Sequence, residues 1–322
     1  MKGNVLKKFL CTCLVTAAAF AATTISASAC TTIYVGGDLV EEGTPFVART
    51  EDYGSDYNKL WFISESGKWK QGDHYVGCPE YGPFEWDFTQ DSYRFTYFTN
   101  DIYYDGICPE CGKKADHYSY TEFGTNEKGV SVSATETLYG NEKVTEADPT
   151  RDAEWAEANK SERTGIEETD IPTIILAEAS SAREGVKLLL DIYENYGCVA
   201  ASGVFICDKD EVWYVENCSG TQYVAIKLNN NMIFLEPNMA VIGRVDLDDE
   251  NVIASKDLIA VAKKAGTFVG DEAKNIIDFR ASYARISEKM DQRMIDGLNY
   301  LNATYKLSLI HISEPTRRRG IS

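Results

Sequence analysis

The sequence predicts an α+β fold, because segments with the pattern of strands and segments with the period of helices follow one another in blocks. Four short strand-like runs cover residues 203–207, 212–216, 223–228 and 232–235, and turn residues such as Asn229-Asn230-Asn231 separate them. Before them, residues 172–179 and 183–196 repeat their apolar side chains at helical spacing, and Gly197 ends the second run. Strands, two helices, strands and further helices indicate a layered α+β domain.

The first 29 residues read as a secretory signal peptide rather than as a buried first helix. Lys2, Lys7 and Lys8 precede an apolar stretch over residues 9–22, and an Ala-Ser-Ala cleavage site occupies residues 27–29. The apolar stretch is shorter than the ~20 residues that span a membrane, and no later segment is long enough. We therefore expect a secreted or extracytoplasmic chain with no integral membrane span.

Cys30 would become the first residue after cleavage. Its α-amine, with a reference pKa of about 7.7–8.0, could then act as the general base for its own thiol. The chain has three histidines, and none lies in a recognisable Cys/His motif. Two other roles stay open here. One is lipid attachment at the cell surface, although Ala27 stands where a lipoprotein signal has a large aliphatic residue, and the other is a disulfide.

A hairpin follows the junction. Residues 31–35 and 45–49 have the pattern of two strands, and Gly36-Gly37 begins the turn between them. Cys30 lies at the open end of this hairpin. The chain reversal brings Arg49 and Asp52 back toward Cys30, which predicts a shared site.

Residues 61–117 show little periodicity, and we expect an irregular insert or lid there. It contains Cys108-Pro-Glu-Cys111-Gly, a knuckle in which two thiolates can reach one zinc ion. The other ligands of such a structural zinc site would be Cys78, His117 or His74. A disulfide is the equal alternative in an exported chain. No metal is expected to take part in catalysis.

The remaining elements continue the layered pattern. A turn at residues 126–129 joins strands over 118–124 and 130–135. The charged stretch 151–170 predicts a solvated helix or loop. Residues 252–264 and 272–286 have helical character.

Residues 307–322 read as an artefact rather than as natural protein. Residues 307–317, LSLIHISEPTR, match the translation of a sequencing-library adapter. We therefore expect one domain over residues 30–306 that is truncated on its C-terminal side, and His311 receives no functional weight.

Charge and cysteine content narrow the classes of function. The chain has 50 acidic and 32 basic residues, a net charge of −18. Such a surface excludes nucleic acid and anionic membranes as expected partners.

Of nine cysteines, Cys11 and Cys13 fall in the signal. The seven that follow are an odd number, and Cys30 is the natural unpaired thiol.

A series of short motifs resembles the PepD-type dipeptidases, which are cysteine N-terminal-nucleophile (Ntn) hydrolases related to bile-salt hydrolases and penicillin V acylases. The motifs are CTTI at 30–33, ARTED at 48–52, NEKGVSVSATET at 126–137, and VWYVE at 212–216 with Ser219-Gly220 after it. They span most of residues 30–306. The resemblance implies an αββα sandwich of two antiparallel sheets covered by helices, short peptides as substrates, and catalysis without a cofactor.

The same resemblance implies roles for single residues. Cys30 would be the nucleophile and Arg49 would favour its thiolate. Asp52 would orient the Cys30 amine. Asn238 would donate to the oxyanion, and Glu136 would line the substrate pocket. The structural alternatives are a surface ion pair for Arg49 and Asp52 and a turn role for Asn238.

Other functions stay open beside the dipeptidase. An acylase resembling bile-salt hydrolase would use the same nucleophile. A lipid-anchored binding protein would carry an acylated, blocked Cys30. The chain could also be inactive if its C-terminal part is missing. Peptide specificity and oligomeric state do not follow from the sequence.

Overall fold

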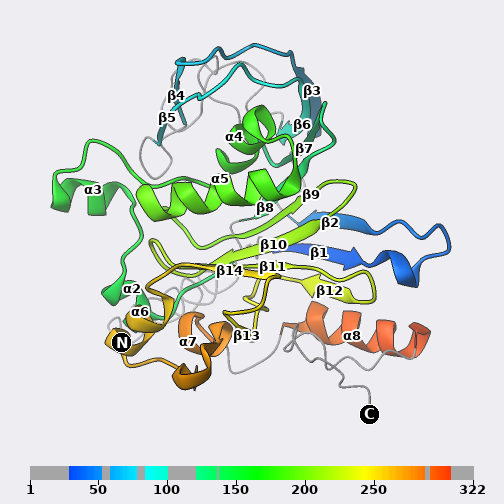
Figure 1. The fold of residues 1–322 in the computed structure, drawn as a ribbon, viewed down its shortest axis with the longest axis vertical. Coiled ribbons are helices and arrows are strands. Elements are labelled where there is room, and N and C mark those ends of the chain that lie inside the picture. Colours follow the sequence, from blue (N-terminus) through cyan, green and yellow to red (C-terminus); the bar gives the residue numbers. More distant parts are fainter. Residues whose placement is uncertain are drawn as a thin grey trace, which may run out of the picture.

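The computed structural model describes residues 29–52, 59–77, 84–100, 121–135, 138–286 and 291–305. Two antiparallel sheets form the centre of this part of the chain (Figure 1). In order across the larger sheet, the strands are β14 (Val252–Ala254), β11 (Tyr223–Lys227), β10 (Val212–Asn217), β9 (Gly203–Cys207), β8 (Ser131–Thr135), β7 (Phe123–Asn126), β6 (Phe95–Asn100) and β3 (Lys59–Ser64). The smaller sheet contains β12 (Ile233–Glu236), β1 (Ala29–Val35) and β2 (Phe46–Asp52) in that order.

Both faces of the central strands of the larger sheet are buried, and their side chains alternate between two cores. In β9, Val204 and Ile206 belong to the core beneath helices α4 (Ile171–Glu178) and α5 (Ala182–Asn195). Phe205, between them, belongs to the core shared with the smaller sheet, where it packs against Phe234. Because successive strand residues point to opposite faces, one apolar run serves both cores.

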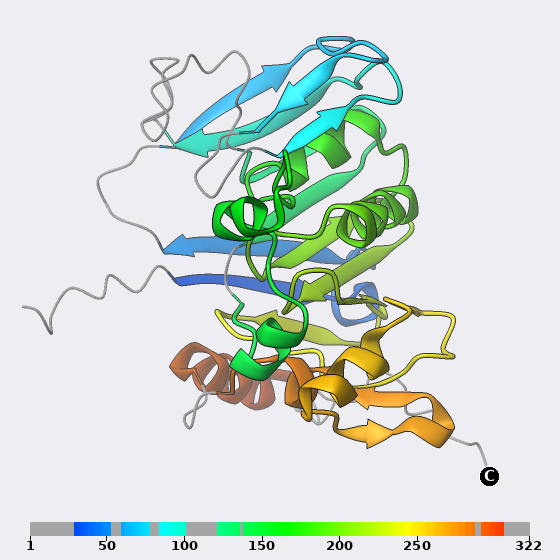
Figure 2. The ribbon, with the colours of Figure 1, turned by 90° about the vertical axis from the view of Figure 1, so that its left-hand side faces the viewer.

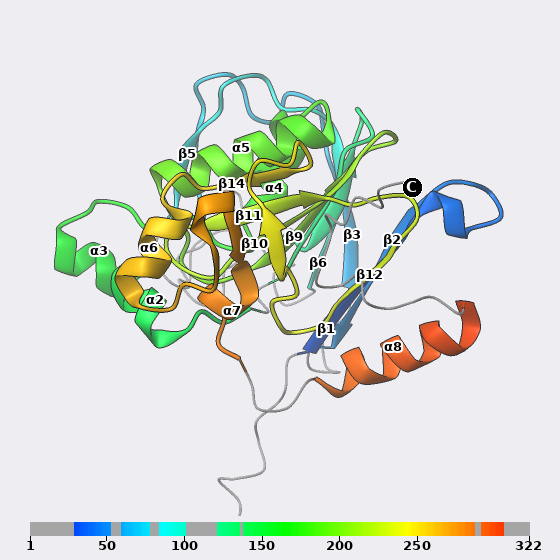
Figure 3. The ribbon, with the colours of Figure 1, turned by 60° about the horizontal axis from the view of Figure 1, so that its bottom comes forward.

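Helix α8 (Gln292–Tyr305) covers the outer face of the smaller sheet, where Leu301 packs with Val35 and Ile233. In Figure 2 the blue strands β1 and β2 lie between the green helices and the red helix α8. Gly297 brings α8 close to β12, because a Cβ atom there would lie 2.4 Å from a methyl carbon of Leu235. Figure 3 shows α8 beside β1 and β12.

Local sequence signals explain the two central helices. Pro172 lies in the first turn of α4, and every residue of that helix is buried. The Ser181 hydroxyl caps α5 by accepting a hydrogen bond from the Glu184 amide. Gly197, with φ of 75°, follows the end of α5. Within the described ranges, no helix has the length and apolar character needed to cross a membrane.

Several predicted elements are confirmed. The hairpin of β1 and β2 is antiparallel, as are the pairings of β7 with β8 and of β9 with β10. The helices predicted at 172–179 and 183–196 match α4 and α5 within a few residues. The mixed α+β class with antiparallel sheets is therefore correct.

The prediction of an irregular insert over residues 61–117 is wrong for the residues described. Strands β3 and β6 pair with each other, and β6 continues the large sheet through β7. Strands β4 (His74–Val76) and β5 (Glu85–Asp87) form a small hairpin beside them. The pattern escapes sequence inspection because aromatic side chains occupy both faces of this edge, and Trp61 is 54% exposed.

The predicted helices at 252–264 and 272–286 are only partly correct. Strand β14 and helix α6 (Leu258–Ala265) share the first range. In the second, Asn275 adopts a left-handed conformation, with φ of 53°, and breaks the helical pattern. The elements around it are β13 (Arg244–Asp246), β15 (Gly270–Asp271), β16 (Ile276–Asp278) and α7 (Phe279–Tyr283), and the chain adds α2 (Glu142–Ala147) and α3 (Ala153–Asn159) earlier.

Candidate active site

Cys30 lies on β1, the middle strand of the smaller sheet, and is 7% exposed. In the β1–β2 register Cys30 is opposite Glu51, and Thr32 is opposite Arg49. Opposite residues of an antiparallel pair share a face, so these four side chains lie on one side of the sheet. The hairpin therefore places a cationic and an anionic side chain beside the thiol.

Arg49 approaches the sulfur directly. Its Nη2 lies 3.5 Å from Cys30 Sγ, and its Nη1 donates to the Ala134 carbonyl at 2.9 Å. Among the described residues, no carboxylate lies within ion-pair distance of this guanidinium. Burial alone would lower the pKa of Arg49, but the negative charges of Cys30 and Glu168 raise it. The same attraction stabilises the Cys30 thiolate, which is the nucleophilic form.

A second charged cluster adjoins Arg49. The main-chain carbonyl of Glu122 accepts a hydrogen bond from Arg49 Nη1 at 3.4 Å. The Glu122 side chain forms an ion pair with Lys59, and Lys59 also pairs with Glu51. Burial, with a hydrogen bond to Glu51, raises the pKa of Glu122 to about 8. Burial would also raise the pKa of Glu51, but its bonds to Glu122 and Lys59 lower it. Glu51 therefore gives up its proton more readily than Glu122, and the two carboxyl groups titrate as a pair.

Asp52 ends β2, and its backbone is opposite Ala29. Removal of residues 1–29 would expose the Cys30 amine at this point of the ladder. The backbone thus places Asp52 next to the expected new terminus. The Asp52 side chain lies outside the described part of the structure.

Asn238 follows β12 in a turn, and one arginine connects it to Cys30. Arg293 Nη2 donates to Asn238 Oδ1 at 2.7 Å, while Nη1 donates to the Cys30 carbonyl at 2.7 Å and to Thr31 Oγ1 at 3.0 Å. Asp291 holds the same guanidinium at 2.9 Å. Because Oδ1 of Asn238 accepts from Arg293, the donating Nδ2 is left for another partner.

Sequence reasoning did not identify Arg293, which lies 263 residues from Cys30. Its only local signal is the Asp-Gln-Arg sequence at 291–293, where the carboxylate and guanidinium of nearby residues pair. That pattern is common on protein surfaces and carries little specificity.

Several predicted site residues fall outside the described residues. These are Glu136 and the candidate zinc ligands Cys78, Cys108, Cys111 and His117. His74 is described, and its Nδ1 lies 2.7 Å from Asp87 Oδ1 across the β4–β5 hairpin. Across the described ranges, no three His, Cys, Asp or Glu side chains gather as metal ligands would. The structural zinc stays a prediction.

A pocket of about 270 Å³ opens on the Arg49 side of the site, between the two sheets. Its lining combines the guanidinium with apolar side chains and hydroxyl groups. These residues include Val47, Arg49, Phe123, Thr125, Ser131, Ser133 and Phe205. A small organic group could therefore lie beside the Arg49 guanidinium, which in turn contacts the Cys30 sulfur.

Together these groups can carry out nucleophilic acyl transfer. A thiolate with a cationic neighbour can attack a carbonyl carbon, and an oriented carboxamide can donate to the developing oxyanion. The base would be the Cys30 amine once it is free.

A model described as "Peptidase family C69" matches residues 29–297. Curated relatives include "Probable dipeptidase B" of Streptococcus pyogenes serotype M6, 32% identical over 76% of this chain and 44% of that protein. "Probable dipeptidase" of Salmonella dublin is 32% identical over 80% of this chain and 53% of that protein. The chain thus spans about half the length of these relatives.

Solved structures give weaker similarities. Penicillin V acylase from Agrobacterium tumefaciens aligns with a TM-score of 0.37 and 15% identity, over 62% of this chain and 52% of that one. A mutant conjugated bile acid hydrolase from Clostridium perfringens aligns with a TM-score of 0.29 and 14% identity, over 75% of this chain and 59% of that one.

Proposed function

This chain belongs to peptidase family C69, and from that membership we propose that it is a dipeptidase whose nucleophile is the thiolate of Cys30. The observation that supports this best is the bridge made by Arg293, which joins the Cys30 carbonyl to Asn238. Two facing antiparallel sheets with outer helices support an Ntn-hydrolase αββα sandwich as the fold. Short peptides are the proposed substrates.

In the proposed reaction, Cys30 Sγ attacks the carbonyl carbon of the peptide bond. The oxyanion accepts hydrogen bonds from Asn238 Nδ2 and a backbone N–H. The C–N bond breaks as the Cys30 ammonium gives its proton to the leaving amine, and a thioester remains. The neutral α-amine of Cys30 then takes a proton from a water molecule, and the oxygen of that water attacks the thioester carbonyl. The acid product leaves and the Cys30 thiol is restored.

The reaction requires a free Cys30 amine, so we propose export with removal of residues 1–29. Intact mass and N-terminal sequencing of protein exported from a bacterial host test this. A chain beginning at unmodified Cys30 supports the proposal. A diacylglyceryl adduct on Cys30 would instead support the lipid-anchored binding protein, and an uncleaved chain would remove the proposed base.

Thiol labelling tests the nucleophile. Burial raises the pKa of Cys198 and Cys218, and raises that of Cys207 to about 11, so these thiols stay protonated at pH 7. We expect iodoacetamide to modify Cys30 fastest, as located by peptide mapping, and to abolish dipeptide hydrolysis. Cys30→Ser should fold but lose most turnover. Full activity of Cys30→Ala would sink the proposal.

An acylase is the second candidate, favoured by the apolar part of the pocket beside Arg49, which includes Val47, Phe123 and Phe205. Turnover of a dipeptide and of an N-acyl amino acid, measured on the same preparation, separates the two. A higher kcat/KM for the N-acyl compound would replace the dipeptidase assignment. A higher value for the dipeptide supports it.

We also propose that catalysis needs no cofactor and that any zinc is structural. Its ligands would be Cys78, Cys108, Cys111 and His117, on the spacing of the knuckle alone. Metal analysis of the purified chain should find one zinc ion, and Cys108→Ser should lose it. Chelation that removes zinc should lower the melting temperature before it lowers turnover per folded molecule.

A further inference from the structure

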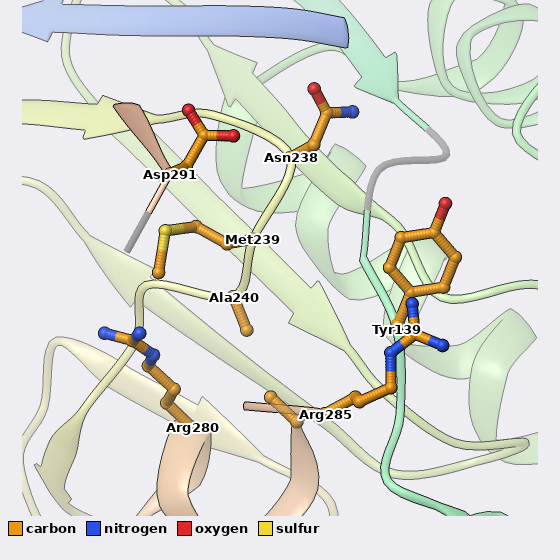
Figure 4. Close-up of a pocket in the computed structure, with 8 residues that line it drawn as sticks. Tyr139, Asn238, Met239, Ala240, Arg280, Arg285 and Asp291 are labelled. Carbon is orange, nitrogen blue, oxygen red and sulfur yellow. The ribbon is translucent and has the colours of Figure 1, made fainter. Parts of the chain in front are cut away.

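A second pocket, of about 280 Å³, opens on the Asn238 side of the candidate site. Figure 4 shows Arg280 and Arg285 on one side of it and Asn238 and Asp291 on the other. The lining residues are Tyr139, Asn238, Met239, Ala240, Arg280, Ala284, Arg285 and Asp291. This pocket is distinct from the one beside Arg49.

Its charge is opposite to that of the chain. The protein has a net charge of −18, yet two guanidinium groups line this pocket. Within the described residues, neither Arg280 nor Arg285 forms an ion pair, although acidic residues outnumber basic ones. Asp291, the carboxylate of the lining, is already neutralised by Arg293. Arg280 also attracts the buried carboxyl group of Glu216, which does not line the pocket. The described lining therefore has an excess of positive charge that an anion can satisfy.

Backbone contacts hold the two arginines in place. Gly140 and Ala284 form a β-bridge, and the Arg285 amide donates to the Tyr139 carbonyl at 2.7 Å. The Arg285 guanidinium lies over the Tyr139 ring, 4.4 Å from its centre. The Arg280 amide donates to the Ile242 carbonyl at 2.8 Å, which ties α7 to the loop after Asn238. The backbone of both arginines and the guanidinium of Arg285 are therefore positioned without a ligand.

Asn238 connects this pocket to the nucleophile. It lines the pocket, and its Oδ1 shares the Arg293 guanidinium with the Cys30 carbonyl. A peptide whose scissile carbonyl lies at Cys30 and Asn238 can therefore extend its leaving residue toward Arg280 and Arg285. In a dipeptide that residue carries a free α-carboxylate.

We propose that this pocket is the subsite for the C-terminal residue of the substrate, and that Arg280 and Arg285 bind its α-carboxylate. The inference rests on the proposed function of Cys30. A guanidinium pair at this position selects peptides whose free carboxylate lies one residue beyond the cleaved bond. Longer peptides and C-terminal amides place an uncharged amide group there and lose the ionic contacts.

The test compares alanyl-leucine with alanyl-leucinamide. We expect wild-type protein with a free Cys30 to hydrolyse the acid with a kcat/KM about tenfold to a hundredfold higher, mostly through KM. The double variant Arg280→Gln/Arg285→Gln should bring the ratio close to one. Arg163→Gln is the matched control, because Arg163 is exposed and also stacks on a tyrosine, Tyr196, elsewhere. It should keep the wild-type ratio.

Equal hydrolysis of acid and amide by wild type would overturn the proposal, as would a double variant that folds and keeps the preference. Isothermal titration calorimetry distinguishes failure of the proposed subsite from failure of the proposed dipeptidase function. If neither compound is hydrolysed, titration of Cys30→Ala with the same two compounds decides. If the dipeptide acid binds more tightly than the amide, and the double variant Arg280→Gln/Arg285→Gln removes this difference, the subsite is supported without support for the dipeptidase function. Equal binding overturns it.

Discussion

Two arginines hold Cys30 from opposite sides, and they do so in different ways. Arg49 comes from the neighbouring strand and approaches the thiol, with no carboxylate partner within ion-pair distance in the described residues. Arg293 comes from α8, approaches the main chain of Cys30, and is paired with Asp291. The charge of the first cation acts on the thiolate and, at longer range, on Glu168, whereas the charge of the second is balanced by a direct ion pair. We infer that Arg49 acts on reactivity and Arg293 on position.

The largest effect should come from removing the charge next to the sulfur. Arg49→Met takes away the guanidinium 3.5 Å from Sγ, and we expect kcat/KM to fall on the order of a thousandfold. Alkylation of Cys30 at neutral pH should slow in parallel. Arg49→Lys, which keeps a charge but cannot make the same set of bonds, should recover part of both rates. Unchanged alkylation in the Met variant would contradict the electrostatic role.

Arg293→Met should lower kcat about a hundredfold, because Cys30 and Asn238 would shift from their positions while Arg49 stays beside the thiol. Alkylation of Cys30 should change little, in contrast to Arg49→Met. Arg293→Lys serves as the charge-preserving control and should remain impaired, because an ammonium cannot bridge Cys30, Asn238 and Asp291 together. A Met variant that alkylates as slowly as Arg49→Met would erase the distinction between the two arginines.

The pH dependence of stability should also differ between the two sides. The pKa of Glu122 is raised from its usual 4.5 to about 8. The stabilisation of the fold by protonated Glu122 is therefore fully present below pH 4.5 and is lost as pH rises through 8. Wild type should therefore lose stability relative to Glu122→Gln over that window, by at most about 1.4 kcal/mol per pH unit.

Asp291→Asn is the comparison on the other side. Its hydrogen bond from Arg293 lowers the pKa of Asp291, so its stabilisation is constant above the usual value of 3.8 and is lost only below it. Urea unfolding at pH 5 and pH 8 measures both variants against wild type. A constant offset is expected for Asp291→Asn and a slope for Glu122→Gln. Parallel curves for Glu122→Gln and wild type would contradict the raised pKa.

The smallest effect should follow Thr31→Val. It removes the hydroxyl that accepts from Arg293 at 3.0 Å while the bonds to Cys30 and Asn238 remain. One hydrogen bond of this kind is worth roughly 0.5–1.5 kcal/mol, so kcat should fall about two- to tenfold. Steady-state kinetics on folded protein checks this. A loss as large as that of Arg293→Met would mean that Thr31 has another role.

The contrast between the arginines also explains what the sequence could reveal. Arg49 lies 19 positions from Cys30, and a strand–turn–strand pattern is enough to bring the two together. Arg293 reaches the site only after α8 has packed on the outer face of the smaller sheet, which depends on tertiary contacts such as Leu301 with Val35. No periodicity in the sequence specifies that packing. The family resemblance is confirmed by the match over residues 29–297.

The fold, too, can be predicted from the sequence only where the local pattern of residues is clear. Strands β9 to β12 were predicted nearly to the residue, because short apolar runs there are separated by clear turns. Strands β3 and β6 were missed because aromatic residues on both faces obscure their alternation. The helical period over residues 272–286 does not predict strand β16, because periodicity does not reveal the left-handed conformation of Asn275.

The docking of α8 has a consequence for heat inactivation. This 14-residue helix includes Gly297 and has little stability of its own. Over residues 292–301 its buried side chains are Met294 and Leu301. Elements with few buried contacts open before the central sheets do. Detachment of α8 would withdraw Arg293 from Cys30 while both sheets stayed intact. Enzymatic activity should therefore disappear at a lower temperature than β-sheet circular dichroism.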